Sequence, residues 1–538
     1  MTKEMTDASR AMLAECRPRE GLRLDELARE IPGGAEVLGD ASMRVYGVHH
    51  DSRRVEPGDL FVARKGQNAD GARFAEQAKE RGAVAILTGR HDDAATFGLP
   101  ALLVDDVPFG FAHASAAIYG HPSFSLEVVG VTGTNGKTTT THLIRAAIDG
   151  AAGSEVCGTI GTVGHAFRDF WLDAAHTTPE ADELARVMAM MRKRGATHVA
   201  MEVSSIALAL GRVRAVRFRV AAFTNLTQDH LDFHKTMEAY GAEKAALFTT
   251  YAPGGAVICV DSPYGAELAK RVRSPVVRVS AEIGKGGELA DIAPTQATLD
   301  ARGIDATLRT PDGPMRIRSL LVGRHNLENI VVAVGVIHAL GLDVARACEA
   351  MGKENGAPGR LERCDGPGDD ITVLVDYAHT PDALARVLAS VRSVTKGRIL
   401  CVFGCGGDRD PTKRGPMGEA VALGADMAVI TNDNPRSEDP KVIAAPIEAA
   451  LVARGMQRAQ HFNDPNVSST MNAFRSYVVE LDRSEAIRIA VRQASAGDVV
   501  LIAGKGHEDY QIVGSEKLPF DDRVEARRAL ASRGGGAR

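Results

Sequence analysis

Short apolar runs rich in β-branched residues alternate with longer segments that repeat apolar residues at helical spacing along most of this chain. The clearest case is the apolar run 126–131, which is followed by a Gly-rich turn and then by the helical pattern at 141–150. The same alternation returns after residue 370. Such a pattern predicts α/β architecture, with mostly parallel sheets covered by helices on both faces.

A length of 538 residues is too great for one ordinary domain. Pro122 and the change of pattern near residue 360 predict three domains: a small mixed α/β unit at 1–124, a central domain at 125–358, and a doubly wound domain at 359–538. The Gly-rich, alternating region 284–318 predicts antiparallel strands on a sheet edge. The other predicted strands are 58–63, 83–87, 101–104, 197–203, 220–224, 371–375, 398–403, 427–431 and 498–503.

Composition narrows the functional classes. Lys and Arg number 64 against 69 Asp and Glu, so the net charge of −5 excludes a chain-wide basic surface for nucleic acid. The seven cysteines form no CxxC pair, which argues against a disulfide framework or a zinc ribbon. No apolar run reaches membrane-spanning length, and the charged N-terminus has no signal-peptide core. We therefore expect a cytoplasmic protein without membrane insertion.

The strongest local motif is the turn between the strand at 126–131 and the following helix. It contains Gly133, Gly136, Lys137 and Thr138. Backbone N–H groups of such a turn bind phosphate oxygens, Lys137 would lie over the β- and γ-phosphates, and the Thr138 hydroxyl would ligate Mg²⁺. The general P-loop has four residues between its glycines, whereas Gly133 and Gly136 enclose two. A plain Gly-rich turn is the alternative.

Two polar features follow the next predicted strands. Glu202 ends the strand 197–203, where a carboxylate can reach a metal at the neighbouring Gly-rich turn, or can instead cap the following helix. The segment 225–234 holds two His and two Asp residues within positions 229–234. A metal cluster is one interpretation, but histidine is a poor Mg²⁺ ligand and the spacing matches no zinc motif, so the segment alone favours a polar turn with ordinary helix caps.

Four polar segments, 376–379, 404–410, 432–436 and 504–508, each follow a predicted strand of the C-terminal region. The carboxyl ends of parallel strands share one crevice, so these segments should converge. Arginines and carboxylates in one pocket suit a zwitterion such as an amino acid, because a guanidinium pairs with its carboxylate and an acid accepts its ammonium. A surface salt-bridge network is the alternative.

Together these motifs resemble the Mur ligase family, the ATP-dependent amide-forming enzymes of peptidoglycan precursor synthesis. The resemblance covers nearly the whole chain and is carried by the segments 51–53, 57–63, 130–141, 201–205, 223–234, 242–244, 376–384, 402–410, 431–440 and 503–514. It implies three domains: one that binds a UDP-sugar, a central P-loop domain that binds ATP, and a Rossmann-like domain that binds the amino acid. Within the family, the Asp-Asn-Pro-Arg sequence at 433–436 is similar to that of members that add meso-diaminopimelate to UDP-N-acetylmuramoyl-L-alanyl-D-glutamate. Arg436 would pair with the distal carboxylate, which lysine lacks.

The resemblance implies a role for each matching residue. ATP would phosphorylate the D-glutamyl carboxylate to an acyl phosphate, which the amine then attacks. The catalytic group would be Lys137, Glu202, His230, Lys244, Asp376 and His379. ATP would contact Thr132, Gly133, Thr134, Asn135, Gly136, Lys137, Thr138, Asn326 and Arg360. Mg²⁺ would bind Thr138 and Glu202, and a second Mg²⁺ would bind Glu202, His230 and Lys244 as a carbamate. The nucleotide sugar would contact Ser52, Gln67, Asn68, Ala69, Thr177, Thr178, Ser204 and Arg212, and diaminopimelate Arg409, Asp433, Asn434, Pro435, Arg436, Gly504 and Glu508.

The chain departs from the family pattern at a few positions. The family usually has His or Gln at the position of Ile206, often Gln at that of Leu210 and often Asn at that of His176. These departures affect contacts to the nucleotide sugar rather than the reaction. The stretch 461–483 is longer than usual, and we expect a surface loop or an extra helix there.

Three other functions fit the residues less well. A lysine-adding homologue and a folylpolyglutamate synthase both disagree with the motifs at 51–53 and 433–436. A non-catalytic nucleotide-binding relative disagrees with the presence of the whole catalytic group. We expect a monomer whose partners are small-molecule substrates and whose domains close on them.

Overall fold

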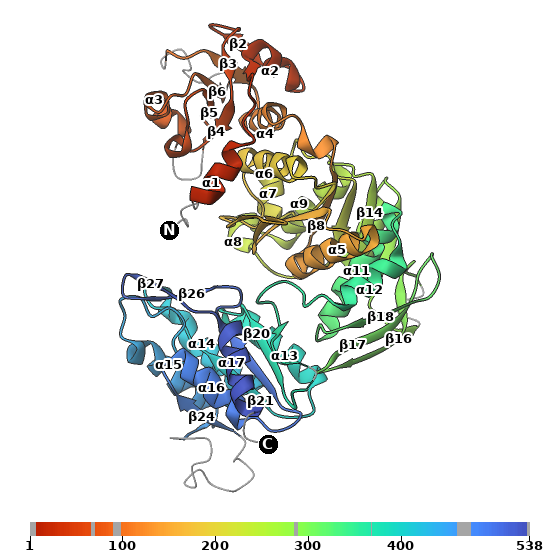
Figure 1. Ribbon diagram of the computed structural model, residues 1–538, viewed down its shortest axis with the longest axis vertical. Coiled ribbons are helices and arrows are strands. Elements are labelled where there is room, and N and C mark those ends of the chain that lie inside the picture. The colour runs from red at the N-terminus through yellow and green to blue at the C-terminus, as the bar shows by residue number, and fades with distance from the viewer. Residues whose placement is uncertain are drawn as a thin grey trace. The chain divides into compact units, whose positions relative to one another are not determined.

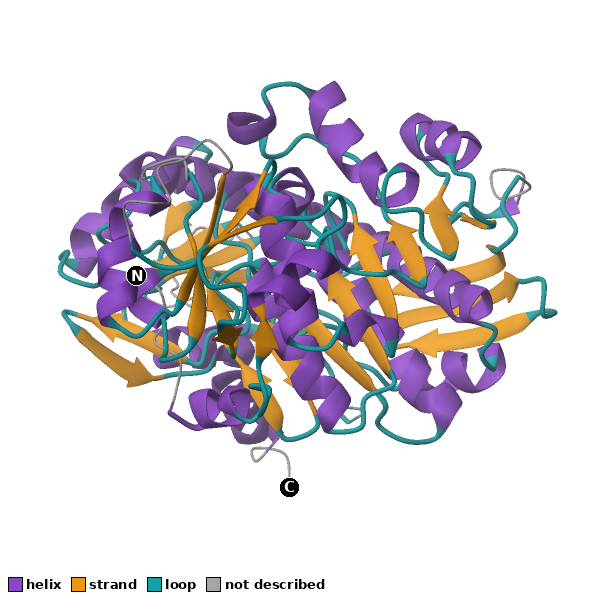
Figure 2. Cartoon of the chain, turned by 90° about the horizontal axis from the view of Figure 1, so that it is seen from above, coloured by secondary structure: helices purple, strands orange, loops and turns teal. Residues whose placement is uncertain are grey.

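The computed structural model describes residues 7–65, 70–89, 98–284, 289–366, 368–459 and 475–534 (Figures 1 and 2). Gln67, Asn68 and Ala69, three of the residues predicted to contact the nucleotide sugar, lie outside these ranges. The chain forms two compact units. The first comprises Met1–Ala293, Arg309–Gly313 and Asn329–Ala350, and the second comprises Pro294–Leu308, Pro314–Glu328 and Met351–Arg538.

The N-terminal part of the first unit is a five-stranded sheet in the order β2-β7-β6-β5-β4. β4 (Gly47–His49), β5 (Asp59–Val62), β6 (Ala85–Gly89) and β7 (Ala101–Val104) are parallel, and β2 (Glu36–Leu38) is antiparallel. Its helices are α1 (Asp7–Ala14), α2 (Leu24–Glu30), α3 (Ala75–Glu80) and α4 (Val107–Ile118), and β1 (Leu22–Arg23) pairs with β3 (Arg44–Val45). The predicted mixed α/β unit is confirmed.

An eight-stranded sheet forms the larger part of the first unit, in the order β11-β10-β9-β12-β8-β13-β14-β15. Its six parallel strands are β8 (Glu127–Thr132), β9 (Cys157–Gly161), β12 (His198–Glu202), β13 (Val220–Phe223), β14 (Gly255–Cys259) and β15 (Val276–Val279), while β10 (Gly164–Phe167) and β11 (Phe170–Leu172) are antiparallel. Because β8 lies between β12 and β13, the Gly-rich turn, Glu202 and the segment after Phe223 meet at one edge.

Helices cover both faces of this sheet, as Figure 2 shows by colour. They are α5 (Lys137–Ala152), α6 (Ala181–Lys193), α7 (Ser205–Ala209), α8 (Leu231–His234), α9 (Met237–Thr249), α10 (Pro263–Arg271), α11 (Arg324–Leu340) and α12 (Val344–Gly352). The strands β16 (Ala293–Asp300), β17 (Gly303–Arg309) and β18 (Met315–Ser319) form a separate three-stranded sheet. The antiparallel pairing expected for region 284–318 is confirmed for β17 and β18, and the region also meets the edge of the eight-stranded sheet, where Ile292 bridges Val279, the last residue of β15.

The second unit is built on a seven-stranded sheet in the order β19-β20-β25-β21-β22-β24-β23. β20 (Thr372–Asp376), β21 (Ile399–Phe403), β22 (Met427–Ile430), β23 (Gln457–Arg458), β24 (Ser476–Val479) and β25 (Val499–Ala503) are parallel, and β19 (Glu362–Arg363) is antiparallel. One apolar core lies on each face of this sheet. The doubly wound arrangement is confirmed, and the four polar segments follow four adjacent strands.

The remaining elements of the second unit are α13 (Pro381–Val394), α14 (Arg414–Gly424), α15 (Pro440–Ala453), α16 (Arg483–Gln493), α17 (Asp522–Gly534) and the hairpin of β26 (Tyr510–Val513) and β27 (Glu516–Pro519). The stretch 461–483 contains β24, so the expectation of a surface loop or helix is wrong for its described part. The apolar run at Tyr477–Val479 is short, and its parallel pairing with β22 decides its structure. Within the described ranges no helix is long and apolar enough to cross a membrane.

The pair of Arg483 and Asp522 generates a stability prediction. Both side chains are fully buried, and Nε and Nη2 of Arg483 donate to the carboxylate at 2.7 and 2.8 Å. Asp522→Ala leaves a buried guanidinium unpaired and should cost about 3–5 kcal/mol of stability. Thermal unfolding measures the loss, with Asp370→Ala as control because its pair with Arg533 is exposed and should cost less than about 1 kcal/mol. Equal melting temperatures of the two variants would contradict the prediction.

Candidate nucleotide and amino-acid sites

The turn between β8 and α5 depends on two glycines. Gly133 has φ +151° and Gly136 has φ +84°, conformations that other residues rarely adopt. A Cβ atom on Gly133 would lie 1.9 Å from Oγ1 of Thr224, and one on Gly136 would lie 2.2 Å from Oδ1 of Asn329. The close packing of both positions explains why the turn tolerates no side chain there.

Lys137 begins α5, and its side chain turns back over the loop. Its Nζ donates to the carbonyl oxygens of Gly133 and Thr134, at 2.9 Å each. The segment after β13 braces the loop from the other side, because the Asn135 amide donates to Oδ1 of Asn225 at 2.9 Å and Oγ1 of Thr224 donates to the Asn135 carbonyl at 2.7 Å. The helix N-terminus and this ammonium provide an environment for phosphate.

Thr138 and Glu202 form the pair of hard oxygen ligands that Mg²⁺ prefers. Oγ1 of Thr138 donates to Oε2 of Glu202 at 2.9 Å, and the amide of Thr162 donates to Oε1 at 2.8 Å. The carboxylate is buried. It does not cap the next helix, because the N-cap of α7 is Ser204, whose Oγ accepts from the Ala207 amide. The donor set fits the ion that the sequence implies.

Lys244 lies on α9 with its side chain buried beneath the loop. Its Nζ donates to the Gly133 carbonyl at 2.8 Å and lies 4.4 Å from the centre of the Tyr240 ring. Burial, with the charge of Lys137 adding to it, lowers the pKa of Lys244 to about 6. The amine is therefore mostly neutral at pH 7, which is the form that reacts with CO₂ to give a carbamate.

His230, another predicted ligand, lies with its ring centre 6.2 Å from that of Tyr240, the ring over which Nζ of Lys244 lies. It precedes α8 in the left-handed conformation, with φ +52°, and its half-exposed ring lies 3.6 Å from Asp229. His234 instead turns inward, and its Nε2 lies 3.0 Å from Oγ of Ser205. In the part of the chain that the structure describes, no three His, Cys, Asp or Glu side chains gather as a metal site.

The described residues predicted to contact the nucleotide sugar lie in two places. Thr177, Thr178, Ser204 and Arg212 form one cluster: Oγ1 of Thr178 accepts from the Ser204 amide at 3.0 Å, and Nη1 of Arg212 donates to the Thr178 carbonyl at 3.0 Å. Oγ1 of Thr177 accepts from Thr162 at 3.1 Å. Ser52 follows β4 in the N-terminal sheet, and its hydroxyl donates to Gln77.

The departures from the family pattern lie beside this cluster. Ile206 and Leu210, on α7 and at its C-cap, are partly exposed, and His176 is exposed. Burial of part of its ring, with the charge of Arg212 adding to it, lowers the pKa of His176.

In the second unit, a buried lysine that sequence reasoning missed lies among the residues predicted to hold the amino acid. Nζ of Lys505 donates to Oδ1 of Asn434 at 3.0 Å and to the Tyr510 carbonyl at 2.7 Å, and lies 3.4 Å from Asp433 and 3.7 Å from Glu508. Burial lowers its pKa and raises that of Glu508. The only signal in the sequence is the lysine between Gly504 and Gly506 at a strand end.

Arg436 and Arg409 flank Gly406, whose missing side chain leaves room for both. A Cβ atom on Gly406 would lie 3.0 Å from Nη1 of Arg436 and 3.7 Å from Cγ of Arg409. Nη1 of Arg436 donates to the Gly407 carbonyl at 2.8 Å. A Cβ atom on Gly407 would lie 1.9 Å from the Pro435 carbonyl oxygen, so the loop at 433–436 packs tightly against this Gly-rich segment. Tyr377 packs against His507, with 5.1 Å between ring centres, so the four segments converge as predicted.

Asp376 and its neighbours lie at the end of β20. Both Asp376 carboxylate oxygens are used within the fold, because they accept from the amides of Leu361 and Ala378 at 2.8 Å. Burial raises its pKa more than the charge of Arg360 lowers it. The Arg360 guanidinium lies 5.1 Å from the centre of the Tyr377 ring, and its buried Nε has no hydrogen-bond partner among the residues that the structure describes. The His379 ring packs against the same tyrosine, with 4.6 Å between ring centres.

Asn326 also belongs to the second unit. It is buried near the start of α11, and its Nδ2 donates to the Val322 carbonyl at 2.8 Å.

Comparison with known families finds three matches along the chain. The Mur ligase family, catalytic domain, matches residues 44–108. The Mur ligase middle domain matches residues 131–337, and the Mur ligase, glutamate ligase domain, matches residues 359–506.

Individual relatives match over nearly the full length. A UDP-N-acetylmuramoyl-L-alanyl-D-glutamate--2,6-diaminopimelate ligase from Gloeobacter violaceus is 43% identical over 95% of this chain and 99% of its own. The enzyme of the same name from Streptomyces coelicolor is 42% identical over 94% and 96%. A solved structure of an enzyme of that name is 31% identical, with a TM-score of 0.69 over 96% of this chain and 99% of its own. The ADP complex of a MurF ligase from Thermotoga maritima shares the fold, at 18% identity and a TM-score of 0.53 over 90% and 96%.

Gly133→Ala tests whether the turn after β8 binds nucleotide. The new methyl group would collide with Thr224 and the backbone would be strained, so we expect affinity for a non-hydrolysable ATP analogue to fall by about tenfold or more. Titration calorimetry with Mg²⁺ measures the affinity. Gly415→Ala is the control, because its Cβ atom would lie 4.0 Å from the nearest heavy atom. Equal affinity in the two variants would refute the assignment.

Proposed function

The chain belongs to the Mur ligase family of ATP-dependent ligases, and we propose that it adds meso-diaminopimelate to the D-glutamate of UDP-N-acetylmuramoyl-L-alanyl-D-glutamate in peptidoglycan precursor synthesis. One observation supports diaminopimelate, rather than lysine, as the amino acid. The loop 433–436 presents Arg436 beside Arg409, while Asp433 and Glu508 lie around Lys505 in the same crevice. Diaminopimelate carries a distal carboxylate that a guanidinium can pair with, and lysine does not.

The proposed reaction has two steps. The γ-phosphoryl group of ATP passes to an oxygen of the D-glutamyl carboxylate, and ADP leaves. The diaminopimelate amine then attacks the acyl carbon, inorganic phosphate leaves, the amine loses a proton and an amide remains. Negative charge develops on phosphoryl oxygens in the first step, so positioning and electrostatic stabilisation dominate catalysis.

The chain's own residues have these proposed roles. Lys137, released from the carbonyls of Gly133 and Thr134, holds the γ-phosphate, and the amides of 132–138 hold the other phosphates. Asn326 and Arg360 contact the nucleotide. The π-face of Tyr377 and the hydrogen bonds of Asp376 fix the loop that carries His379 near the reacting carboxylate.

Mg²⁺ would neutralise charge on the phosphoryl oxygens. Thr138 and Glu202 would hold one ion, and Glu202, His230 and a carbamate on Lys244 would hold a second. The low pKa of Lys244 supports the carbamate, because only a neutral amine adds to CO₂. His230 would have to turn toward the other ligands, and its exposed position before α8 leaves it room to do so.

The nucleotide sugar and diaminopimelate would bind at separate places. The nucleotide sugar would contact Ser52 and the cluster of Thr177, Thr178, Ser204 and Arg212, together with residues 67–69. Diaminopimelate would contact Arg409, Asp433, Asn434, Pro435, Arg436, Gly504 and Glu508. We further propose the domain division 1–124, 125–358 and 359–538, a monomeric state, and a cytoplasmic location, where nucleotide-linked precursors and ATP are available.

Phosphate release tests the proposed function and the role of Arg436 together. The full chain is incubated with ATP, Mg²⁺ and UDP-N-acetylmuramoyl-L-alanyl-D-glutamate, with meso-diaminopimelate or L-lysine as acceptor. We expect release with diaminopimelate only. Arg436→Ala should raise KM for diaminopimelate by about 10- to 100-fold and leave KM for ATP nearly unchanged, because only the distal carboxylate loses its partner.

The controls separate the possible failures. Lys137→Ala should abolish release in a folded protein, which excludes a contaminating ATPase. Release with lysine would keep the ligase and overturn the role of Arg436. A wild-type chain that releases phosphate with neither acceptor would favour another acceptor or the non-catalytic alternative.

Carbamylation of Lys244 is tested independently of turnover. Protein equilibrated at pH 7 to 8 with ¹³C-bicarbonate should show one protein-bound carbamate resonance that disappears in Lys244→Ala. Lys235→Ala is the control, because that exposed lysine follows α8 without burial of its amine. A spectrum of wild-type protein without a carbamate signal would remove Lys244 from the proposed metal ligands.

A further inference from the structure

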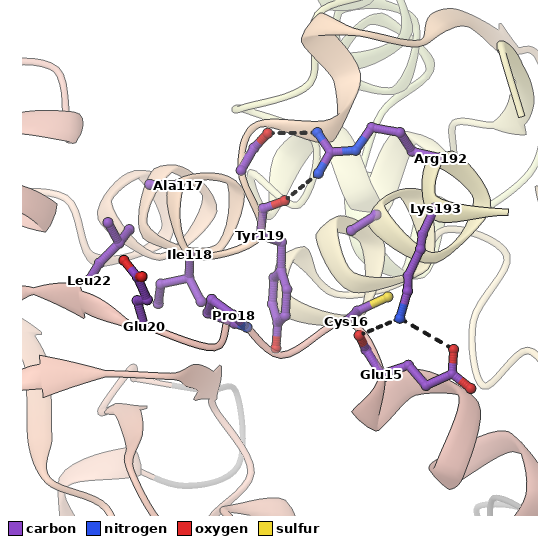
Figure 3. Close-up of a pocket in the computed structure, with 13 residues that line it drawn as sticks. Glu15, Cys16, Pro18, Glu20, Leu22, Ala117, Ile118, Tyr119, Arg192 and Lys193 are labelled. Atoms are coloured by element: carbon purple, nitrogen blue, oxygen red, sulfur yellow. Dashed lines mark hydrogen bonds and ion pairs between the residues drawn. The ribbon is translucent and has the colours of Figure 1, made fainter. Parts of the chain in front are cut away.

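Helix α6 contacts the N-terminal part of the chain at both of its ends. At its C-terminal end, Arg192 donates to the carbonyls of Tyr119 and Gly120 at 3.2 and 2.8 Å, and Lys193 donates to the Glu15 carbonyl at 2.9 Å (Figure 3). These contacts border a cavity of about 630 Å³, and none of the predicted site residues is among its described lining residues. The helix therefore attaches the N-terminal part to the eight-stranded sheet.

The first turn of α6 carries acidic side chains that pair with cations of the N-terminal part. Glu180, the N-cap, accepts from Nη1 of Arg64 at 2.8 Å. Glu183 accepts from Nη1 of Arg54 at 3.1 Å. Arg54 follows β4 and Arg64 follows β5, which is parallel to β4. These pairs therefore fix the same side of the N-terminal sheet against α6.

Asp182 is the buried centre of these contacts. Its Oδ2 lies 3.2 Å from Nδ1 of His49 and 3.4 Å from Nδ1 of His50, the last residue of β4 and its successor. Nη2 of Arg186 lies 2.7 Å from Nε2 of His49, and Nε of the same arginine donates to the Tyr119 hydroxyl at 3.0 Å. A neutral His49 that donates from Nδ1 and accepts at Nε2 satisfies both contacts.

The charges in this cluster balance one another. Burial raises the pKa of Asp182, but the two histidines outweigh it and the net pKa lies well below the ordinary value. Burial lowers the pKa of His49, and the charge of Arg186 lowers it further. The cluster thus contains an ionised carboxylate between a neutral histidine, a buried guanidinium and the partly exposed His50. Removing the carboxylate would leave Nδ1 of the buried His49 without its acceptor and His50 without its anionic partner, while Asp59, 3.8 Å from Nε2 of His49, would remain as the nearby anion.

The residues of this cluster lie close in sequence to the two places that the nucleotide sugar is proposed to contact. Ser52 follows His50 by two residues, and Asp182 follows Thr178 by four. Glu180, between them, also pairs with Arg212 at 2.7 Å. A shift of α6 against β4 would therefore change the spacing of Ser52 from Thr178 and Arg212.

We infer that Asp182 is a positioning residue for the nucleotide sugar, which holds β4 and the first turn of α6 at the spacing that substrate binding requires. The inference rests on the proposed function. It assigns Asp182 no contact with the substrate, and it differs from a purely structural role in one respect. A structural role would lower stability alone, or would weaken all substrates alike, whereas a positioning role weakens the nucleotide sugar selectively.

Binding measurements on the full chain test this inference. Asp182→Asn keeps the shape and removes the charge, and we expect its Kd for UDP-N-acetylmuramoyl-L-alanyl-D-glutamate, measured by titration calorimetry, to rise by about tenfold or more. Its KM for ATP and for diaminopimelate at saturating nucleotide sugar should stay within about twofold of wild type. His50→Gln, at a partly exposed position, should show a smaller rise in the same direction. Combined with Asp182→Asn, it should add little, because both changes break one interaction.

Asp106→Asn is the matched control. Asp106 forms an ion pair with Arg214 between the same two parts of the chain, but the pair is exposed and Asn retains the cap of α4. Its Kd should equal that of wild type. The inference is overturned if Asp182→Asn binds the nucleotide sugar as Asp106→Asn does, or if its affinity falls equally for all three substrates. If Asp182→Asn does not fold, His50→Gln decides between the same outcomes. A wild-type chain that binds no nucleotide sugar would instead remove the proposed function together with this inference.

Discussion

The carbonyl oxygen of Gly133 is the point on which the nucleotide end of the molecule depends. It accepts from Nζ of Lys137 at 2.9 Å and from Nζ of Lys244 at 2.8 Å, so two lysine amines meet at one backbone atom. Two ammonium ions so close in a buried place would repel strongly. Burial lowers the pKa of Lys244 to about 6, and the nearby charge of Lys137 lowers it further. The same contact that shapes the loop therefore prepares a neutral amine.

The second unit also buries a lysine, but acidic side chains surround it. Lys505 is as deeply buried as Lys244, but Asp433, Glu508 and Asn434 surround it. Burial still lowers its pKa, and the two carboxylates counter that effect. Among the described residues, Lys244 therefore has no carboxylate within ion-pair distance, whereas two carboxylates lie within 4 Å of Nζ of Lys505. The difference follows from the neighbours, because Lys244 reaches from α9 to the carbonyl of Gly133 and Lys505 follows β25 among acidic side chains.

The sequence predicted features that depend on local pattern, and missed those that depend on distant contacts. The apolar runs of β8, β12, β20 and β25 were placed because a buried parallel strand has an unmistakable composition. Glu202 had two interpretations until its contact with Thr138 and the Ser204 cap decided between them. The strand β24 was missed because its four residues become a strand only by pairing with β22.

In the candidate sites too, features set by local sequence pattern were predicted and features set by distant contacts were missed. Glycines and charged residues at strand ends were recognised because the topology of parallel sheets brings them together. Lys505 was overlooked since nothing in its sequence neighbourhood reveals that Asp433 and Asn434 enclose it. His49 and Asp182 stand 133 positions apart, and neither lies in a motif, so only the packing of α6 against β4 reveals their contact.

A substrate that bridges two sheets places a particular demand on such a contact. If the N-terminal sheet moved freely against α6, each binding event would have to fix that motion, and the cost would be subtracted from the affinity for the nucleotide sugar. A buried charge cluster suits this task better than an apolar contact alone. Hydrogen bonds between His49, Asp182 and Arg186 are satisfied in one register, and a slipped register would leave charged groups buried without partners. Apolar packing penalises small shifts far less steeply, because it has no preferred direction. The polar centre of this interface thus fixes geometry, while the surrounding apolar residues supply most of the stability.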